Sequence, residues 1–487
     1  MKKIILICCC LFLIQNIHSQ SYQVLNSANG TSAGFETLID NDDVFGYVEV
    51  RKLDLEDKLT EKFKYIVLDK NMNSVCNGEF TQKLVKKKCE NMIFQIVYTN
   101  NHILFFFTEY FNDRNNYLQV RDSYQILDIN TNKIVTSGFF DKTLNDGMSI
   151  PKLYSIYQRR IAVSVSDIGF MIQSKKEFDD QGLQTFYYVI DFNGKILWEQ
   201  VSKTAEEKHF YDYTLFDKDK ENAVFLLTKM RKTKKVSDHI LVLNAKTGKE
   251  IAFTDFSNEK YTMRFSSVNV LNGKVQIIGR FFEKEKRDRV DTDESLGLYR
   301  RVIDLKSGKI LNEDFLTYDK FKNPNIDENG RIRKEGNLNF SKFNINPDGS
   351  YFVIAETYID KSRGAMFTEL YTFTLDKDFV PIEMKSFDVN RTRGSKYSFS
   401  QELPNKVGKA YFFYDKNEDK DLQLNILKYM YASKKMSIDK MALTSKKSNV
   451  NVVRAKTGYV GIIESFKNAG KGEKQLEIRL EKINFER

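Results

Sequence analysis

Basic side chains gather in four short segments of this sequence, each lying between two apolar runs. Arginine and lysine groups placed in this way can bind phosphate, sulfate or carboxylate groups. The candidate anion-binding residues are Arg231, Lys232, Lys234, Lys235, Lys286, Arg287, Arg289, Arg331, Arg333, Arg391 and Arg393. Charged loops also occur simply because they keep a protein soluble. The pattern therefore predicts an anion-binding surface on the condition that these segments converge in the fold.

Side chains suited to covalent or acid–base catalysis are scarce. Of the 4 histidines, His18 lies in the N-terminal segment, which leaves His102, His209 and His239. A Ser–His or Cys–His mechanism needs a histidine beside a nucleophile, and His209, in an expected loop, is the candidate for mutation. The sequence shows neither a phosphate-binding Gly-rich loop nor a Cys-x-x-Cys motif. We therefore expect no catalytic residues, no metal and no cofactor.

The first twenty residues have the pattern of an export signal. Lys2 and Lys3 precede an apolar run, Ile4–Ile14, which is shorter than the roughly 20 residues that a membrane-spanning helix needs. We expect residues 1–20 to be a signal peptide, cleaved near Ser19 or Gln20, and the protein to be periplasmic or extracellular. Removing the two lysines leaves 74 basic and 66 acidic residues, because the whole chain has 76 and 66, and lowers the net charge from +10 to +8.

Two cysteines remain after the signal, Cys76 and Cys89. An exported chain meets an oxidising compartment, where a Cys76–Cys89 disulfide could form. Two separate buried thiols are the alternative, and the spacing alone does not decide between them because a disulfide needs a specific geometry.

A hairpin motif recurs along the rest of the chain. An apolar run ends in an acidic or amide residue, a short turn follows, often with glycine, and a second apolar run begins. Four apolar runs make up each repeat. The turn residue is Asp69, Asp128, Asp191, Asn244, Asp304 and Asp376 in successive repeats. Repeats of this length with four strands are typical of β-propeller blades.

The predicted fold is all-β, with residues 21–487 forming a single propeller of eight four-stranded blades; seven blades are the alternative. Middle strands such as Tyr351–Ala355 are apolar without alternation, as expected for strands covered on both faces. The eighth repeat lacks its fourth strand. We expect Tyr22–Leu25 to supply it, because pairing the two chain ends closes the ring and removes an open sheet edge.

The hairpins resemble those of two known groups of propellers. The segments Asn244-Ala-Lys-Thr-Gly-Lys-Glu and Asp191-Phe-Asn-Gly-Lys-Ile-Leu-Trp are similar to repeats of quinoprotein-like (PQQ-like) propellers. The segment Asn346-Pro-Asp-Gly-Ser-Tyr-Phe resembles the turn of TolB and WD40-like propellers. The resemblance implies the architecture. Quinoprotein blades typically carry a docking tryptophan in every repeat, whereas this chain has 1 Trp, so a bound quinone is not expected.

Loop lengths predict two different ends of the ring. Turns from first to second and from third to fourth strands are mostly short, whereas second-to-third turns and blade-to-blade connections are mostly longer and carry the basic segments. Binding usually resides on such loops. We expect a non-catalytic binding or scaffold protein of the bacterial envelope, whose partner is an envelope protein or an anionic polysaccharide. The sequence has no motif for specific nucleic-acid binding and no transmembrane segment after the signal.

The alternative function is a propeller glycoside hydrolase. Such an enzyme would use two carboxylates at the central funnel, about 5–10 Å apart. The sequence has too many acidic residues for such a pair to be chosen from their order alone. The oligomeric state is not set by the sequence.

Overall fold

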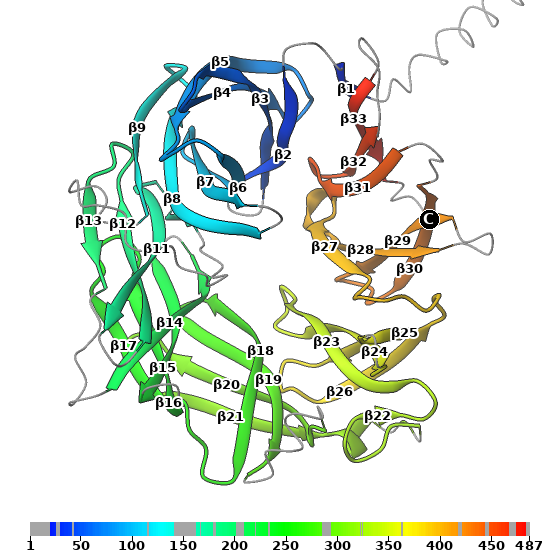
Figure 1. Ribbon diagram of the computed structural model, residues 1–487. Helices are drawn as coiled ribbons and strands as arrows, with labels where there is room; N and C mark the ends of the chain where they lie inside the picture. Colours follow the sequence, from blue (N-terminus) through cyan, green and yellow to red (C-terminus); the bar gives the residue numbers. More distant parts are fainter. Residues whose placement is uncertain are drawn as a thin grey trace, which may run out of the picture.

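Eight antiparallel sheets stand around a common centre in the computed structural model, each forming one blade of a ring (Figure 1). The predicted all-β propeller with eight blades is therefore confirmed, and the seven-blade alternative is wrong. The structure describes residues 20–25, 30–40, 43–113, 116–140, 162–165, 167–178, 182–200, 209–219, 221–231, 234–284, 294–321, 323, 325–361, 364–416, 421–443, 448–466 and 474–483.

The first four blades each have four strands, named here from the inner to the outer strand. They are β2 (Thr31–Asp40), β3 (Asp43–Asp57), β4 (Thr60–Asp69) and β5 (Ser74–Lys83); β6 (Cys89–Thr99), β7 (His102–Asp113), β8 (Asn116–Asp128) and β9 (Lys133–Phe139); β10 (Ala162–Val165), β11 (Gly169–Phe178), β12 (Gly182–Ile190) and β13 (Ile196–Glu199); and β14 (His209–Lys218), β15 (Asn222–Arg231), β16 (Lys234–Asn244) and β17 (Glu250–Asp255).

Blades 5 to 8 follow the same plan, with one added strand in blade 6. They are β18 (Tyr261–Leu271), β19 (Lys274–Glu283), β20 (Gly297–Asp304) and β21 (Ile310–Thr317); β22 (Arg331–Ile332), β23 (Gly336–Ile345), β24 (Tyr351–Ile359), β25 (Met366–Leu375) and β26 (Pro381–Phe387); β27 (Tyr397–Glu402), β28 (Gly408–Lys416), β29 (Leu422–Met430) and β30 (Met436–Ala442); and β31 (Ser448–Arg454), β32 (Tyr459–Phe466), β33 (Lys474–Lys482) and β1 (Gln20–Leu25). Two short 3₁₀ turns, η2 (Tyr318–Phe321) and η3 (Pro404–Lys406), lie among the described residues.

The ring closes where the two ends of the chain meet, as the sequence predicted. β1 pairs antiparallel with β33, with Tyr22 opposite Ile478, and so supplies the fourth strand of blade 8. Blade 8 then meets blade 1. The Thr37 hydroxyl donates a hydrogen bond of 3.1 Å to the Arg454 carbonyl, and the Lys456 ammonium donates one of 2.8 Å to Asn71 Oδ1. Contacts between residues this distant in sequence hold the last blade against the first.

The middle strands are apolar on both sides because each sheet face presses on a neighbouring blade. In β24, Tyr351, Val353 and Ala355 pack in one cluster with Ile278 and Leu298 of blade 5. The alternate residues, Phe352 and Ile354, pack in another cluster with Tyr411 and Leu427 of blade 7. Alternate side chains of a strand point to opposite faces, so one strand contributes to two cores.

The turn residues of the repeat cap their own hairpins. Asp69 Oδ1 accepts hydrogen bonds from the backbone N–H groups of Asn71 (2.7 Å) and Asn73 (2.8 Å). Asp304 Oδ2 accepts hydrogen bonds from the Ser307 hydroxyl (2.6 Å) and the Ser307 N–H (2.8 Å), and these local hydrogen bonds lower the pKa of the Asp304 carboxyl. A short polar side chain that bonds its own backbone two or three residues on is a turn-forming device.

The only tryptophan joins two blades. Trp198, in the outer strand of blade 3, donates its indole N–H to the Ala245 carbonyl of blade 4 at 3.0 Å. Gly248 lies under the ring with a φ of +68°, and a Cβ at that position would come within 2.7 Å of the indole. Glycine is therefore required there both for the backbone conformation and for the close approach.

The ring has two unlike ends, which we call the short-turn end and the long-loop end. The short-turn end carries the first-to-second and third-to-fourth turns, and the long-loop end carries the second-to-third turns and the connections between blades. The expectation that second-to-third turns are long holds only in part, because β3 and β4 are joined by residues 58–59 alone.

Buried tyrosines predict the response of the fold to alkali. Burial raises the pKa to about 12 for Tyr65, Tyr98, Tyr124, Tyr187 and Tyr429. In the unfolded chain tyrosine titrates near about pH 10. Because the folded-state pKa is the higher one, this stabilisation is complete below about pH 10 and is lost as the pH rises towards about 12. We expect the free energy of unfolding, measured by urea denaturation, to fall steeply above about pH 10.

The variant Tyr124→Phe provides the comparison for this prediction. It removes one ionisable phenol from the interior, so its stability should decline less between about pH 9 and about pH 11 than that of the parent chain. An equal decline in stability of the Tyr124→Phe variant and the parent chain over this pH range would contradict the prediction.

Candidate functional site

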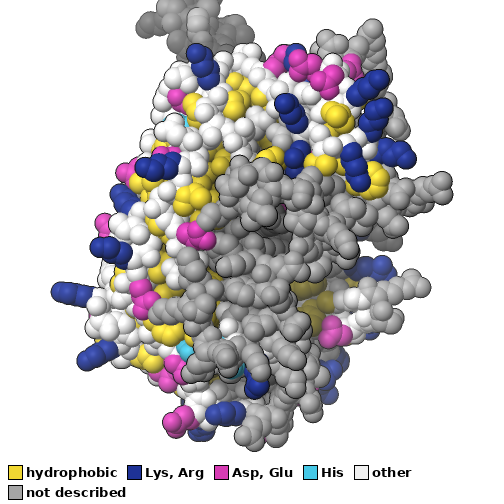
Figure 2. Space-filling view, turned by 60° about the vertical axis from the view of Figure 1, so that its left-hand side comes forward, with side chains coloured by type: hydrophobic (Ala, Val, Ile, Leu, Met, Phe, Trp, Pro, Cys, Tyr) yellow, Lys and Arg dark blue, Asp and Glu magenta, His cyan; other side chains and the backbone are white. Residues whose placement is uncertain are grey.

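The predicted basic segments are distributed over several blades. Arg231 is exposed at the end of β15, opposite Lys234, which starts β16, and Lys235 lies opposite Met230. The residues Lys232, Lys286, Arg287 and Arg289 lie outside the described residues. In the view of Figure 2, Lys and Arg side chains stand among Asp and Glu side chains over the surface. Blade 5 separates Arg231 in blade 4 from the arginines of blade 6 (Figure 1), so the described segments do not all converge.

Two of the segments lie at the same end, the long-loop end, of blade 6. Arg331 lies in β22, and Arg333 lies in the turn that follows. Arg391 and Arg393 flank Thr392 in the connection from blade 6 to blade 7. All four arginines are exposed.

Strand pairing fixes the distance between these two arginine pairs. A row of directly opposite residues crosses the end of blade 6: Arg331, Asn337, Tyr358, Phe367 and Thr392. Four steps of about 4.8 Å between neighbouring strands place Arg331 about 19 Å from Thr392 along the backbone. Residues directly opposite one another point to the same face of a sheet, so Arg331 and Thr392 share one face, while Arg391 and Arg393, the chain neighbours of Thr392, alternate with it.

None of these four guanidinium groups forms an ion pair or hydrogen bond with a residue that the structure describes. The contrast with blade 5 is clear, because Arg300 bonds Asp314 at 2.7 Å and Arg301 bonds Glu313. Both of those arginines are buried and serve packing between strands. The exposed arginines of blade 6 remain available to an external anion.

A buried carboxylate fixes the connection that carries Arg391 and Arg393. Glu356 is 0% exposed and accepts hydrogen bonds from the Lys396 backbone N–H (2.7 Å), the Ser341 hydroxyl (3.0 Å) and the Ser395 hydroxyl. The Lys396 ammonium donates to the Thr368 carbonyl at 3.0 Å. Burial lowers the pKa of Lys396, and nearby carboxylates, Glu356 foremost, partly oppose that effect. The polar network holds the basic connection against blade 6.

Acidic side chains share this end of the blade. Burial raises the pKa of the Glu369 carboxyl, and repulsion from Asp388 and Glu335 raises it further. The Tyr371 hydroxyl donates a hydrogen bond to Glu335 Oε2, and with 5% exposure this phenol is too buried to attack a substrate. The surface is therefore mixed in charge, with the arginine pairs at both margins of the blade.

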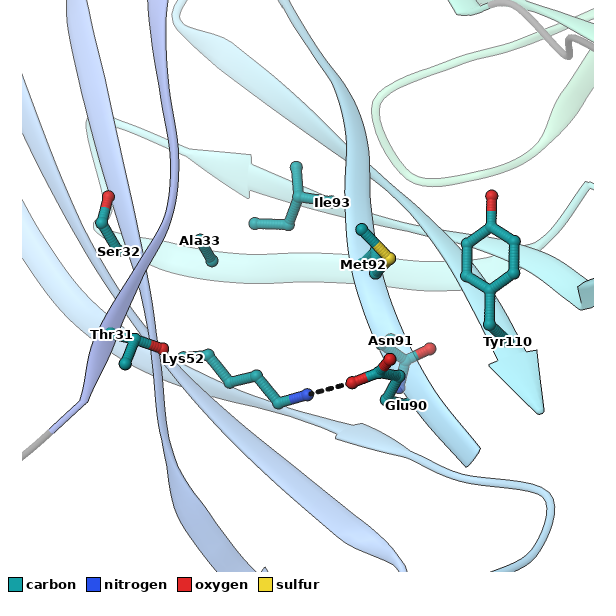
Figure 3. A pocket seen from close by; sticks show the side chains of 9 residues that line it. All are labelled: Thr31, Ser32, Ala33, Lys52, Glu90, Asn91, Met92, Ile93 and Tyr110. Atoms are coloured by element: carbon teal, nitrogen blue, oxygen red, sulfur yellow. Dashed lines mark ion pairs between the residues drawn. The ribbon is translucent and has the colours of Figure 1, made fainter. Parts of the chain in front are cut away.

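A groove of about 540 Å³ opens at the long-loop end between β2 and β6. In Figure 3 the Lys52 ammonium points towards Glu90, 4.0 Å away. The described lining consists of Thr31, Ser32, Ala33, Lys52, Glu90, Asn91, Met92, Ile93 and Tyr110. This lining is partly apolar and partly polar, which suits a small organic ligand.

The carboxylates near this groove do not form a catalytic pair. Glu61 lies behind it with 2% exposure and is engaged by Lys52 at 2.6 Å and by both the backbone and side-chain N–H groups of Asn91 at 2.9 Å. Glu90 is the only carboxylate among the described lining residues. A glycoside hydrolase needs two carboxylates that face one substrate, and Glu61 faces the protein.

The histidines also differ from the expectations. His209 begins strand β14, opposite Arg231, so its predicted place in a loop is wrong. His239 Nε2 lies 2.9 Å from the Ser237 hydroxyl, which is the geometry of a nucleophile and its base. The Asp255 carboxylate is 4.0 Å from His239 Nδ1, beyond hydrogen-bond distance. The acid that would orient this base is therefore not in place.

The two cysteines are free thiols, which corresponds to the alternative of separate thiols. Cys76 lies within β5 of blade 1, whereas Cys89 begins β6 of blade 2. Burial, together with the Glu109 carboxylate, raises the pKa of Cys89 to about 11. A thiol with such a pKa is protonated and weakly reactive at neutral pH.

Comparison with known protein families assigns the chain to one of them. The profile of a family described as a family of unknown function, DUF6770, matches residues 1–370 and 368–484. The chain belongs to the DUF6770 family. No curated protein matches it. Among the residues described for this DUF6770 protein, no helix is long and apolar enough to cross a membrane, and no group of three His, Cys, Asp or Glu side chains could hold a metal ion.

Solved structures similar to the DUF6770 chain include several proteins of low identity. A polysaccharide lyase, Uly1, has a TM-score of 0.44 and 9% identity over 80% of this chain and 89% of that chain. A prolyl endopeptidase has a TM-score of 0.39 and 9% identity over 87% of this chain, which spans 54% of the endopeptidase. The WD40 domain of SCAP from fission yeast has a TM-score of 0.26 and 11% identity, covering 80% and 94% of the two chains. Structural similarity with TM-scores and sequence identities this low supports no inference about activity.

Sequence reasoning identified the exposed arginines but missed the residues that position them. Glu356 is the only charged residue in the otherwise apolar or uncharged strand Tyr351–Ile359. A lone carboxylate in a strand expected to be covered on both faces must be hydrogen-bonded, and that signal could have identified it. Its partner Lys396 follows in the next connection and has no comparable sequence signal.

Replacing Glu356 tests how the basic connection is held. The change Glu356→Ala leaves the buried Lys396 N–H and the Ser341 and Ser395 hydroxyls without this acceptor, which should cost roughly 2–4 kcal/mol of unfolding free energy. Hydrogen exchange in residues 388–396 should become faster. The matched control is Glu383→Ala, at an exposed carboxylate of β26. Unchanged protection of residues 388–396 in the Glu356 variant would contradict this role.

Proposed function

We propose that this DUF6770 protein is an exported propeller of the bacterial envelope that binds an acidic ligand at the long-loop end, without catalysis. One observation carries the proposal: four exposed arginines at the end of blade 6 have no partner among the described residues. Guanidinium groups bind carboxylate, sulfate and phosphate groups with two parallel hydrogen bonds. The ligand classes that fit are an anionic polysaccharide and an acidic envelope protein, the latter giving a scaffold role.

The alternative, a glycoside hydrolase with carboxylates at the funnel, has less support. Among the described residues, the groove between β2 and β6 presents Glu90 to a ligand, while Glu61 is saturated by hydrogen bonds within the protein. A bound ligand there would be held without the acid and the nucleophile or base that hydrolysis needs. Binding is therefore the function that we favour for both surfaces.

Retention on a sulfated polysaccharide resin tests the proposal. The mature protein should bind immobilised heparin at low ionic strength, and the variant with Arg331, Arg333, Arg391 and Arg393 changed to Ala should elute at a clearly lower salt concentration, because exposed charges act through screened attraction. The control changes the same number of exposed cations at the short-turn end to Ala: Lys70, Lys249, Lys306 and Lys309. Equal losses in both variants would show only an effect of net charge and would refute the site.

Export is tested separately by expressing the full chain in a bacterium with two membranes. We expect the segment 1–20 to be removed and the protein to appear in the periplasm, at the cell surface or in the medium, because its basic start and short apolar run fit a signal peptide. N-terminal sequencing of the recovered protein checks the cleavage position near Ser19 or Gln20. An unprocessed protein confined to the cytoplasm would refute this part of the proposal.

A further inference from the structure

The groove between β2 and β6 has two unlike sides. Figure 3 shows the apolar side chains of Ala33, Ile93 and Met92 on one side and the ion pair of Lys52 and Glu90 on the other. Met92 is 52% exposed, so its apolar surface is accessible to a ligand. The volume of about 540 Å³ lies within the range of about 300–1,000 Å³ that is usual for small-molecule sites. Such a groove fits a ligand with an apolar body and a polar end.

The polar side of the groove is held in place by a carboxylate behind it. Glu61 accepts hydrogen bonds of 2.9 Å from the backbone N–H and from the side-chain Nδ2 of Asn91. Its Oε1 atom lies 2.6 Å from the Lys52 ammonium. These contacts join β3, β4 and β6, and so blade 1 to blade 2. Side chains that are already held in this way lose little freedom when a ligand binds.

The charges beside the groove leave one carboxylate in excess. Lys52 is the only cation among the described lining residues, and its short contact is with Glu61. Its ammonium lies 4.0 Å from Glu90, which is beyond hydrogen-bond distance. One ammonium thus stands against two carboxylates, and Glu90, whose side chain is 39% exposed, is the one in the lining. The groove therefore attracts a cation rather than an anion.

A second acceptor in the lining has no donor. Asn91 is 3% exposed, and its Oδ1 atom has no hydrogen-bond partner among the described residues. An ionised carboxylate only accepts hydrogen bonds, so the Asn91 Nδ2 must face Glu61 and the Oδ1 atom points away from that carboxylate. Buried acceptors without a donor are uncommon in folded proteins. Both unmatched groups of the lining are therefore acceptors, and a ligand with N–H donors complements them.

We infer that this groove binds a small organic amine, whose ammonium group pairs with Glu90 and whose apolar body packs on Ala33, Ile93 and Met92. An ammonium group is a cation with three N–H donors, so it matches both the excess negative charge and the unmatched acceptors. A neutral ligand of the same shape leaves Glu90 without a counter-charge, and an anion is repelled by it. The inference does not depend on the arginines of blade 6, which lie on another blade and carry the opposite charge to Glu90.

Calorimetric titration with compounds of one shape tests the inference. The probes are 2-phenylethylamine, 2-phenylethanol and 3-phenylpropionate, which share an aromatic body and end in a cation, a neutral group and an anion. The mature protein should bind the amine roughly tenfold or more tightly than the alcohol, as expected for a hydrogen bond to a charged group. The anion should bind more weakly than the alcohol. Ethylamine, which lacks the apolar body, should bind about tenfold more weakly than 2-phenylethylamine.

Two substitutions separate the roles of the two sides. Glu90→Gln keeps the shape of the side chain and removes its charge, so it should reduce the preference for the amine to about twofold or less and leave the binding of 2-phenylethanol unchanged. Met92→Ser removes apolar surface and should weaken the amine and the alcohol by the same factor. Circular dichroism checks that both variants keep the fold. The control Glu383→Gln, at a carboxylate of β26 that is 43% exposed and lies beside Lys385, should behave as the parent.

Each contrary result has a defined meaning. A preference for the amine that survives in the Glu90→Gln variant would overturn the assignment of the ammonium group to Glu90. Tighter binding of 3-phenylpropionate than of the amine would show that Lys52 is the binding group, which overturns the inference. Absence of binding by all four compounds would overturn the groove as a site for this class of ligand. None of these results bears on the acidic ligand of blade 6, which retention on heparin tests separately.

Discussion

The two apolar faces of each sheet are the constraint on which this structure depends. The sheet that contains β24 and β25 has buried side chains on both faces, and leaving either face in water would cost its hydrophobic stabilisation. Each blade therefore needs a neighbour on both sides. A line of blades would leave two faces uncovered, whereas a ring leaves none. The pairing of β1 with β33 completes blade 8, and the seam from Thr37 to Arg454 joins it to blade 1.

The two ends of the ring are held by different polar devices. At the short-turn end, aspartates such as Asp304 bond the backbone of their own turn, so these turns are fixed locally. At the long-loop end, buried carboxylates receive backbone N–H groups from the connections between blades: Glu109 from Val85 at 2.7 Å, and Glu356 from Lys396 at 2.7 Å. Each connection is thereby anchored near the core while its outer residues remain free to vary, which is a suitable base for a binding surface.

The candidate site shows why local pattern alone gives only part of an answer. The sequence identified every basic segment but supplied no distance between them, and the structure separates Arg231 in blade 4 from the arginines of blade 6. It also allowed a Cys76–Cys89 disulfide, whereas the two thiols are free and lie in different blades. His209 was expected in a loop, yet it pairs with Arg231 and begins β14.

The sequence by itself determined the all-β propeller architecture, the turn residues and the strand that closes the ring, and it favoured eight blades over seven. These features follow from periodicity and turn chemistry, which act between residues close in sequence, and from the general cost of an open sheet edge. The tertiary structure decided that Arg331, Tyr358, Phe367 and Thr392 share one row. That arrangement is the sum of several cross-strand registers, including a register shift between β24 and β25, and each register is fixed by packing between segments that local sequence pattern does not bring together.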